Sequence, residues 1–333
     1  MIKQFAEKLF VAVMAAFSLP LFAQNEVNPV KDNDRKLVED IEKAGKFDFW
    51  TLRVMEESAI IGGDTAYLYE PSLANDTISG RQAYMNPDGC VWRTSNVYAD
   101  VVGVVKTSTS VFPERRGDGY CARLETYFEE LKVFGLLNME VTVQGSIFLG
   151  RLPEPIRNTS NPQGKLLFGF PFTSRPSALQ LDYKAIVGNE AVKATGFSKK
   201  KPLGYADYAD IVMMLQYRWE DEEGNVYAKR VGTAYKRITE SVTEWQNGYT
   251  VPVKYGDITS DPGYEPYMGL IKEEVSNYTL NSKGKSVPVH EVGWAEPGTE
   301  PNFLIIRFSS SYGVAFSGGI GNKFWIDNVK LVF

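Results

Sequence analysis

The chain has 333 residues, of which 41 are acidic and 36 are basic, so its formal net charge is −5. This mild acidity, without a long basic run, argues against nucleic acid as a partner. The single histidine, His290, excludes catalytic zinc sites that use several histidines, and a Ser-His-Asp or Cys-His mechanism would depend on that one residue. Carboxylate chemistry and oxygen-ligated metals stay open, because neither needs histidine.

The N-terminal residues have the pattern of a secretory signal peptide. Lys3 and Lys8 precede the apolar run LFVAVMAAF, and a proline and a small residue follow it. We therefore predict a signal peptide over residues 1–23, with cleavage after Ala23 and export to the periplasm, the cell surface or the medium. The apolar run is shorter than the roughly 20 residues that cross a bilayer, so we expect no transmembrane segment in the mature chain.

Two cysteines, Cys90 and Cys121, allow two predictions. In an oxidising compartment they would form a disulfide. Alternatively, both are buried thiols. The sequence leaves this choice open, because a disulfide requires Cα atoms within about 7 Å of each other.

The first element after the signal peptide is a predicted helix over residues 32–46, within a helical segment or spacer that spans residues 24–46. Asp32 or Asn33 is expected to cap its N-terminus, and Gly45 is expected to end it. The apolar stripe of this helix consists of Leu37, Val38 and Ile41.

The remaining residues, 47–333, mostly have the composition of β-strands. β-Branched and aromatic residues predict strands at 47–54, 138–149, 207–219, 225–235, 302–311 and 323–333. The turn EDEEGN predicts a hairpin. Many strands without alternating helices favour an all-β fold, with one antiparallel β-sandwich domain. Residues 55–80 and 255–300 are predicted to be loops, and such loops are where sites are usually built.

The stretch LLFGFPFTSRPSALQLDYKA at 166–185 is a strand with an interruption. We expect a bend or bulge at Gly169, and an edge position for Pro171, which has no backbone donor. Phe168, Phe170 and Phe172 are spaced to face one side of the strand. Arg175 is predicted to tether this corner to a neighbouring segment, in preference to binding a ligand.

The same residues carry a resemblance. The run Gly169, Pro171, Phe172, Arg175, Pro176, Leu179 and Tyr183 resembles the signature G-x-P-F-x-x-R-P-x-x-L-x-x-x-Y of the putative carbohydrate metabolism domain (PCMD) family. GYCARLET at 119–126 and FWIDNVKLVF at 324–333 also resemble strands of that family, so the similarity covers most of residues 90–333. The resemblance implies an exported protein of Gram-negative gut bacteria, a jelly-roll sandwich of galactose-binding type and a role in glycan handling. It supplies no catalytic residues.

Asp327 lies within the otherwise apolar closing strand, where an unpaired buried carboxylate would be costly. An arginine, backbone donors or a metal ion would compensate it. Carbohydrate-binding jelly rolls often hold a structural calcium ion with an acid at this place, which implies a calcium site here with Asp48 as a partner. The alternative is that Asp327 faces solvent or caps a turn.

Aromatic rings are the natural surface for stacking a sugar, because a pyranose presents a face of C–H groups. Those in turn-rich or polar segments are the candidate carbohydrate-binding residues: Trp92, Trp245, Tyr249, Tyr264, Tyr267 and Trp294. Trp50, Trp219 and Trp325 lie within predicted strands and are expected in the core.

Three functions follow from the sequence. The first is an exported protein that binds a glycan or glycoconjugate without chemistry. The second is a glycoside hydrolase with two carboxyl groups about 5–10 Å apart, for which the acids at 220–223, Glu273, Glu274, Glu291 and Glu296 are available, although no pair can be chosen. The third is a structural or adhesive surface component.

Processing of the N-terminus is directly testable. Because cleavage is predicted after Ala23, the mature protein isolated from an exporting bacterial host should begin at or near Gln24 in intact-mass and N-terminal peptide spectra. Recovery of the uncleaved chain from the membrane fraction would contradict the predicted signal peptide.

Overall fold

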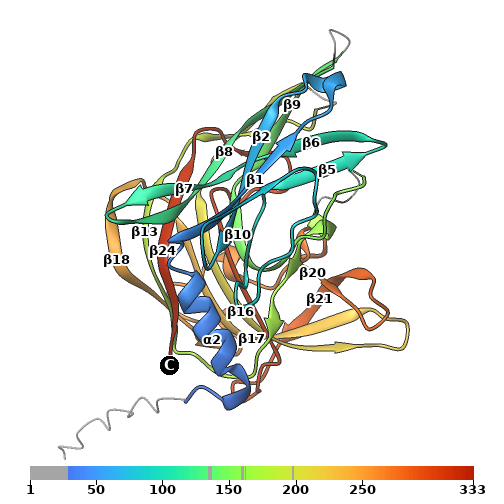
Figure 1. Ribbon diagram of the computed structural model, residues 1–333. Coiled ribbons are helices and arrows are strands. Elements are labelled where there is room, and N and C mark those ends of the chain that lie inside the picture. The colour runs from blue at the N-terminus through green and yellow to red at the C-terminus, as the bar shows by residue number, and fades with distance from the viewer. Residues whose placement is uncertain (1–28, 134–136, 159–160, 162, 197–198) are drawn as a thin grey trace, which may run out of the picture.

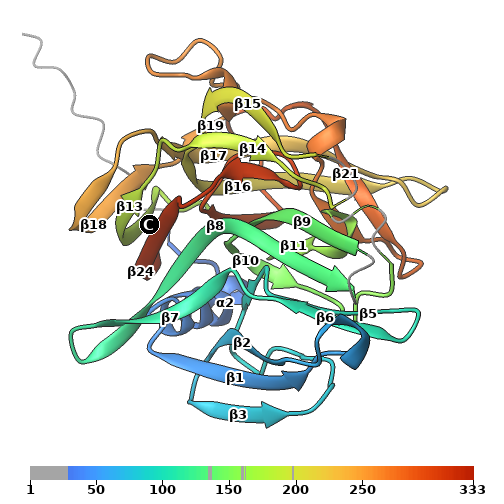
Figure 2. The same ribbon diagram turned by 90° about the horizontal axis from the view of Figure 1, so that it is seen from above.

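The computed structural model describes residues 29–333 except 134–136, 159–160, 162 and 197–198, so the predicted signal peptide lies outside the described residues. Two large sheets enclose one main hydrophobic core, and a small N-terminal sheet lies outside them (Figures 1 and 2). The all-β sandwich that the sequence predicts is confirmed.

The first large sheet has the strand order β18-β13-β24-β8-β7, with β9 also paired to β8, and its neighbours are antiparallel. The last strand of the chain, β24, therefore lies between β13 and β8. The strands are β7 (Val111–Arg116), β8 (Gly119–Val133), β9 (Leu137–Gln144), β13 (Ala178–Ile186), β18 (Val242–Pro252) and β24 (Lys323–Val332).

The second large sheet has the order β12-β22-β16-β17-β21-β20-β11-β10-β4, with β19 paired to β17. Strand β10 also pairs with β22, so the sheet closes on itself. The pairs β17–β21 and β11–β20 are parallel. The strands are β4 (Trp92–Thr94), β10 (Ser146–Arg151), β11 (Leu167–Phe168), β12 (Phe170–Pro171), β16 (Ala209–Glu220), β17 (Val226–Ile238), β19 (Lys254–Tyr255), β20 (Tyr278–Leu280), β21 (Ser286–Trp294) and β22 (Phe303–Ser309).

Three small sheets complete the fold: β2-β1-β3, β15-β14-β23 and β5-β6. Residues 55–80, predicted as loop, contain strands of the first of these, and residues 255–300 contain β20 and β21. The small strands are β1 (Phe49–Glu56), β2 (Thr65–Ser72), β3 (Asp76–Ser79), β5 (Val97–Val101), β6 (Val104–Ser108), β14 (Glu190–Lys193), β15 (Lys201–Ala206) and β23 (Ser317–Gly319), and the short 3-10 helices are η1 (Ala59–Ile61), η2 (Gln163–Lys165), η3 (Pro266–Met268) and η4 (Glu273–Val275).

The main core forms because alternate residues of both large sheets are apolar. On β16, Ile211, Met213 and Leu215 are fully buried in it, and Val212 and Met214 belong to a second cluster on the opposite face. On β13, Leu179 and Leu181 are fully buried against the same core from the other sheet. Period-two alternation thus decides which side chains lie between the sheets.

Helix α2 (Asp32–Ala44) packs its Ile41 and Ala44 into the main core. It ends at Gly45, as predicted, where a Cβ would lie 2.6 Å from the Ile41 carbonyl and 2.8 Å from that of Val329, so only glycine fits. The predicted N-terminal cap by Asp32 or Asn33 is wrong, because the cap is Lys31 and no side chain bonds there.

Gly169 makes the bend that the sequence predicts. Its φ is +88°, and a Cβ would lie 2.4 Å from the Leu304 carbonyl oxygen. Before the bend β11 pairs with β10 and β20, and after it β12 pairs with β22. The chain therefore changes its pairing partners, and the expectation that Phe168, Phe170 and Phe172 face one side is wrong. Phe168 packs in the second cluster, and the other two pack against the main core.

Four buried charges join the N-terminal sheet to the sandwich. Arg93 on β4 lies 2.7 Å from Glu70 on β2 and 3.0 Å from Glu154, and Arg53 on β1 lies 2.6 Å from Glu154. All four side chains are at most 1% exposed, and the ring of Tyr84 lies against both guanidinium groups. Burial raises the pKa of Glu70 to about 7, and the two arginines oppose that rise.

Both cysteines are free and buried in the structure. The Cys90 thiol donates to the Pro71 carbonyl at 3.2 Å, and the Cys121 thiol to that of Glu114 at 3.5 Å. Burial raises the pKa of each thiol to about 12.

Arg175 makes the contacts of a tether. Its guanidinium donates to the backbone carbonyls of Thr299 (2.5 Å) and Pro297 (2.6 Å) and lies on the ring of Tyr255, with 3.9 Å between Cζ and the ring centroid. Tyr255 in turn donates its hydroxyl proton to the Pro176 carbonyl at 2.7 Å.

We therefore predict that Arg175→Ala lowers the free energy of unfolding by about 1.5–3 kcal/mol, because a charge-assisted hydrogen bond is lost. Chemical denaturation of the purified protein measures this. Arg151→Ala, at the exposed end of β10, is the control and should change stability by less than about 0.5 kcal/mol. Equal stability of the two variants would show that Arg175 is not a tether.

Candidate functional site

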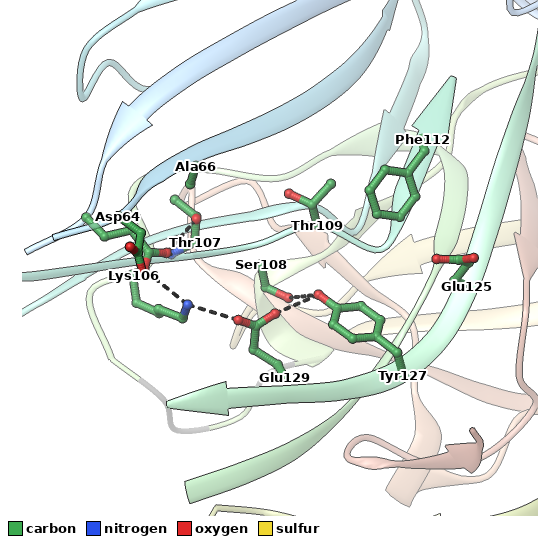
Figure 3. A pocket seen from close by; sticks show the side chains of 11 residues that line it. Asp64, Ala66, Lys106, Thr107, Ser108, Thr109, Phe112, Glu125, Tyr127 and Glu129 are labelled. Atoms are coloured by element: carbon green, nitrogen blue, oxygen red, sulfur yellow. Dashed lines mark hydrogen bonds and ion pairs between the residues drawn. The ribbon is translucent and has the colours of Figure 1, made fainter. Parts of the chain in front are cut away.

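An open groove of about 340 Å³ lies between β2, β6, β7 and the outer face of β8 (Figure 3). The inward face of β8 carries Ala122 and Leu124 in the main core, so period two turns Glu125, Tyr127 and Glu129 outward, into the groove. The lining side chains are mostly polar or aromatic: Glu57, Asp64, Ala66, Lys106, Thr107, Ser108, Thr109, Phe112, Glu125, Tyr127 and Glu129.

Lys106 organises one end of the groove. Its ammonium group lies 2.9 Å from Glu129 Oε1 and 3.1 Å from Glu57 Oε2. The Tyr127 hydroxyl donates to Glu129 Oε2 at 2.6 Å, as Figure 3 shows. Burial and the neighbouring Glu129 raise the pKa of Tyr127, so its phenol stays protonated and remains a donor. Burial opposes a rise in the pKa of Lys106, but the two glutamates raise it overall.

Phe112 and Glu125 form the other end. Glu125 pairs with Lys323, 2.9 Å away, and with Arg123. The Arg123 guanidinium also lies over the Phe112 ring, with 4.6 Å between Cζ and the centroid. The groove therefore offers an aromatic face next to fixed carboxylates, a combination that suits a ligand with C–H faces and hydroxyl groups.

The groove holds three glutamates that could supply a pair of catalytic carboxylates. Glu57 and Glu129 lie closest, because both contact the Lys106 ammonium group, at 3.1 and 2.9 Å. Glu125 and Glu129 lie on one face of β8, four residues apart, which separates their backbones by about 13 Å. Each of them forms an ion pair with a lysine, Glu57 and Glu129 with Lys106 and Glu125 with Lys323, so these carboxylates are already engaged as acceptors. This arrangement suits binding of hydroxyl groups better than general acid catalysis.

A second hollow, of about 430 Å³, lies close by and is lined by Trp50, Leu52, Tyr69, Asn75, Asp76, Thr77, Pro113 and Tyr120. The Tyr69 ring packs against Phe112 of the groove, with centroids 6.1 Å apart. The N-terminal sheet thus contributes to the walls of both hollows.

The structure distributes the six candidate aromatic residues over the molecule and places none of them among the residues that line the two hollows. Trp92 is fully buried, and its indole donates to the Ile41 carbonyl at 3.1 Å. Tyr249 packs edge-on against Tyr183. Trp245 lies on Arg116, and Trp294 near Arg230. Tyr264 lies in the loop after β19 and Tyr267 in the short helix η3, where it contacts Tyr235 and Arg237.

Trp50 and Trp325 are buried, as expected, but Trp219 is 39% exposed, so its assignment to the core is wrong. The sequence analysis also missed Phe112, Glu125, Tyr127 and Glu129. The signal that identifies Glu125, Tyr127 and Glu129 is the alternation in CARLETYFEE at 121–130, and Phe112 lies outside this stretch.

Two of the acids that the sequence offers for catalysis, Glu291 and Glu220, have structural partners. Glu291 is buried and accepts hydrogen bonds from Arg230, Gln216 and the Ile271 amide. Burial opposes a fall in its pKa, but these partners lower it overall. Glu220, at the hairpin tip, accepts from Ser282. Glu273 and Glu296 are exposed, and the side chain of Glu274 lies outside the described residues.

Asp327 is compensated by an arginine and a backbone donor. Arg116 donates to its Oδ2 at 2.6 Å, and the Asn328 amide donates to its Oδ1 at 2.8 Å. Asp48 instead accepts from the Tyr120 amide at 3.3 Å. Among the described residues, no group of three or more His, Cys, Asp or Glu side chains is placed to hold a metal ion. The calcium site at Asp48 and Asp327 stays a prediction, which thermal unfolding with and without a chelator would test.

These features define a β-sandwich with an open groove in which aromatic rings adjoin fixed charges. The chain belongs to the family described as "Putative carbohydrate metabolism domain" (PCMD), whose model matches residues 72–332, so the domain is carbohydrate-related. No curated protein sequence matches the chain. Among the described residues, no helix has the length and apolar character needed to cross a membrane.

Two solved structures similar to this chain are described as putative glycoside hydrolases. One, from Bacteroides thetaiotaomicron, is 20% identical, with a TM-score of 0.44, and the match covers 84% of this chain and 70% of that one. The other, from Bacteroides vulgatus, is 15% identical, with a TM-score of 0.41, and the match covers 80% of this chain and 91% of that one. Similarity at this level carries no conclusion about this chain.

The titration of Asp327 gives a test of its environment. Burial raises its pKa from 3.8 to about 6, although Arg116 opposes the rise. The folded protein therefore binds more protons than the unfolded chain between these values, and the free energy of unfolding falls as the pH rises from about 4 to about 6.

We predict that Asp327→Asn removes this part of the pH dependence, so that the wild type loses stability relative to the variant across this window. Chemical denaturation at several pH values measures the difference. Arg116→Gln is the matched variant, and it should raise the pKa of Asp327 further, as followed by carboxyl ¹³C NMR. Parallel pH profiles of the wild type and Asp327→Asn would contradict the assignment.

Proposed function

We propose that the protein is an exported glycan-binding protein, and that its groove holds the sugar without cleaving it. The observation that supports this proposal is the pairing of the Phe112 ring with the fixed polar groups of Glu125, Tyr127 and Glu129 in an open groove. Membership of a carbohydrate-related family supports the class of ligand, and the predicted signal peptide supports export.

Each part of the groove has a role in this proposal. A pyranose would stack its C–H face on Phe112, because an aromatic ring offers a large, rigid apolar surface. The carboxylates of Glu125 and Glu129 would accept hydrogen bonds from sugar hydroxyl groups, and Lys106 would donate. The ion pairs that hold these groups fix them before the ligand arrives, which reduces the entropic cost of binding.

Hydrolysis is the second candidate, because Glu57, Glu125 and Glu129 share one groove, and Glu57 and Glu129 both contact Lys106. A retaining or inverting glycosidase requires one carboxyl group to deliver a proton. In the free protein all three are ion-paired, so a hydrolase would need the ligand to displace Lys106 or Lys323.

The proposal predicts binding without turnover. An array of short plant and host oligosaccharides would identify a ligand, and calorimetry would give its Kd. Phe112→Ala should weaken binding at least tenfold, about 1.4 kcal/mol. Phe49→Ala, which removes a 45% exposed ring of β1 outside both hollows, is the control and should leave Kd unchanged.

Glu125→Gln keeps the shape of the side chain and tests the groove independently if Phe112→Ala does not fold. It should also weaken binding, with a thermal unfolding curve close to that of the wild type. Product analysis of the bound oligosaccharide decides between the two candidates. If the wild type cleaves the oligosaccharide and Glu125→Gln or Glu129→Gln does not, the protein is a hydrolase and the proposal of binding without cleavage is wrong.

A further inference from the structure

The hairpin β16–β17 continues beyond the neighbouring strand β22. The pairing of β22 with β16 ends at Phe303, opposite Gln216, so the last four residues of β16 have no strand on that side. Figure 1 shows the hairpin, in yellow, projecting from the sandwich beside β21, and Figure 2 shows the same projection from above.

One face of this projecting hairpin is covered and the other is open. Gln216 is fully buried and Arg218 is only 9% exposed, with its guanidinium on the Phe303 ring. The intervening Tyr217 and Trp219 are 45% and 39% exposed. By period two, Tyr217 and Trp219 lie on the same face of β16 as Leu215, which is in the main core. At these two positions nothing covers that face, so the aromatic side chains are exposed.

Four aromatic rings from three strands line up on the open face. Consecutive ring centroids are 6.3 Å apart for Tyr217 and Trp219, 5.8 Å for Trp219 and Tyr227, and 5.6 Å for Tyr227 and His290. The angles between successive ring planes are 37°, 22° and 38°, and the rings of Trp219 and Tyr227 are stacked, so the four rings form a continuous row in which neighbouring rings partly cover each other. We call these four residues the aromatic ladder.

We propose that the aromatic ladder is a second glycan-binding surface, on which successive pyranose rings of a neutral polysaccharide stack. The ligand class rests on the proposed function of the groove. The row supports a chain ligand, because the exposed rings of Tyr217 and Trp219 follow one strand and can pack against the C–H groups of successive sugars. Exposed aromatic rings in a row are otherwise a costly surface for a protein outside the cell to present to water.

The groups at the edge of the ladder fit a polyhydroxylated ligand. Lys229 lies directly across from Tyr217 on β17 and is exposed, and Asp221 interacts with the Tyr227 hydroxyl. An apolar protein surface would leave the Lys229 ammonium group without solvent or a partner, whereas Lys229 and Asp221 can both bond sugar hydroxyl groups. The acidic residues 220–223 at the hairpin tip disfavour a polyanionic glycan.

A second copy of the chain is a poorer occupant. A stable protein interface uses about 20–30 residues on each side, and the ladder offers four rings. The ladder and the groove share no residue, since they are built on different strands. One polysaccharide chain that contacts both would therefore gain avidity without any new contact at either site.

The test is affinity electrophoresis in native gels that contain xyloglucan, galactomannan, arabinoxylan or amylopectin, with polygalacturonate as the anionic probe. The wild type should be retarded by at least one neutral polymer and not by polygalacturonate. The double variant Trp219→Ala/Tyr227→Ala should raise the apparent Kd for that polymer at least tenfold, and Trp219→Phe, which keeps a ring, should retain most of the binding. Phe49→Ala is the control for loss of an exposed ring, and thermal unfolding confirms that each variant is folded.

The outcomes separate the two proposals. If the ladder variant loses polymer binding but keeps the wild-type Kd for the short oligosaccharide bound in the groove, both proposals are supported. If the ladder variant binds every polymer as the wild type does, or if the wild type binds none of them, the ladder proposal is overturned, and the oligosaccharide measurements judge the groove alone. Sedimentation provides the remaining outcome. A wild-type dimer that becomes monomeric in Trp219→Ala/Tyr227→Ala would show that the ladder binds a second copy, and would also overturn the proposal.

Discussion

The buried ion-pair cluster of Arg53, Glu70, Arg93 and Glu154 is the constraint on which the candidate site depends. Each charge comes from a different segment, and none is more than 1% exposed, so any one of them would be strongly unfavourable without the others. A purely apolar contact would allow the N-terminal sheet to slide over the sandwich. Two carboxylates and two guanidinium groups have few satisfactory arrangements, and this fixes the sheet against β4.

The groove follows from that placement. One wall is the N-terminal sheet, and the floor is the outer face of β8, whose inner face is part of the main core. The same alternation that builds the core therefore also supplies the polar floor of the groove. Ion pairs hold the floor residues in place without a ligand, so the groove is organised by the fold itself.

The sequence predicted those features that depend on neighbouring residues in the chain. Helix α2 and its end at Gly45, the β16–β17 hairpin and the bend at Gly169 all follow from local composition and spacing. The partner of Asp327 did not follow, because Arg116 is far away in the sequence and its guanidinium arrives only through the pairing of β7, β8 and β24.

The candidate site was harder to predict, for a related reason. Alternation shows which residues share a face of a strand, but not whether another layer covers that face. Trp92 lies in a turn-rich segment and is fully buried, because α2 packs over it. Trp219 has the pattern of a core residue and is exposed, because the neighbouring strand stops short. Strand β3 was missed because it is only four residues long and contains Asp and Ser, which local propensity assigns to loops, and β2 was missed although its sequence TAYLYEPS alternates tyrosines with smaller or apolar residues.

The position of the C-terminal strands has a consequence for how the protein is made. Strand β24 lies between β13 and β8, so the first sheet is continuous only when the last strand of the chain is in place, and β22 pairs with both β16 and β10 and so closes the second sheet. Strand β8 is therefore synthesised with an unpaired edge, because its partner β24 lies about 200 residues later in the chain. The small N-terminal sheet can pair locally, but the two large sheets are completed only after the C-terminal strands have been made.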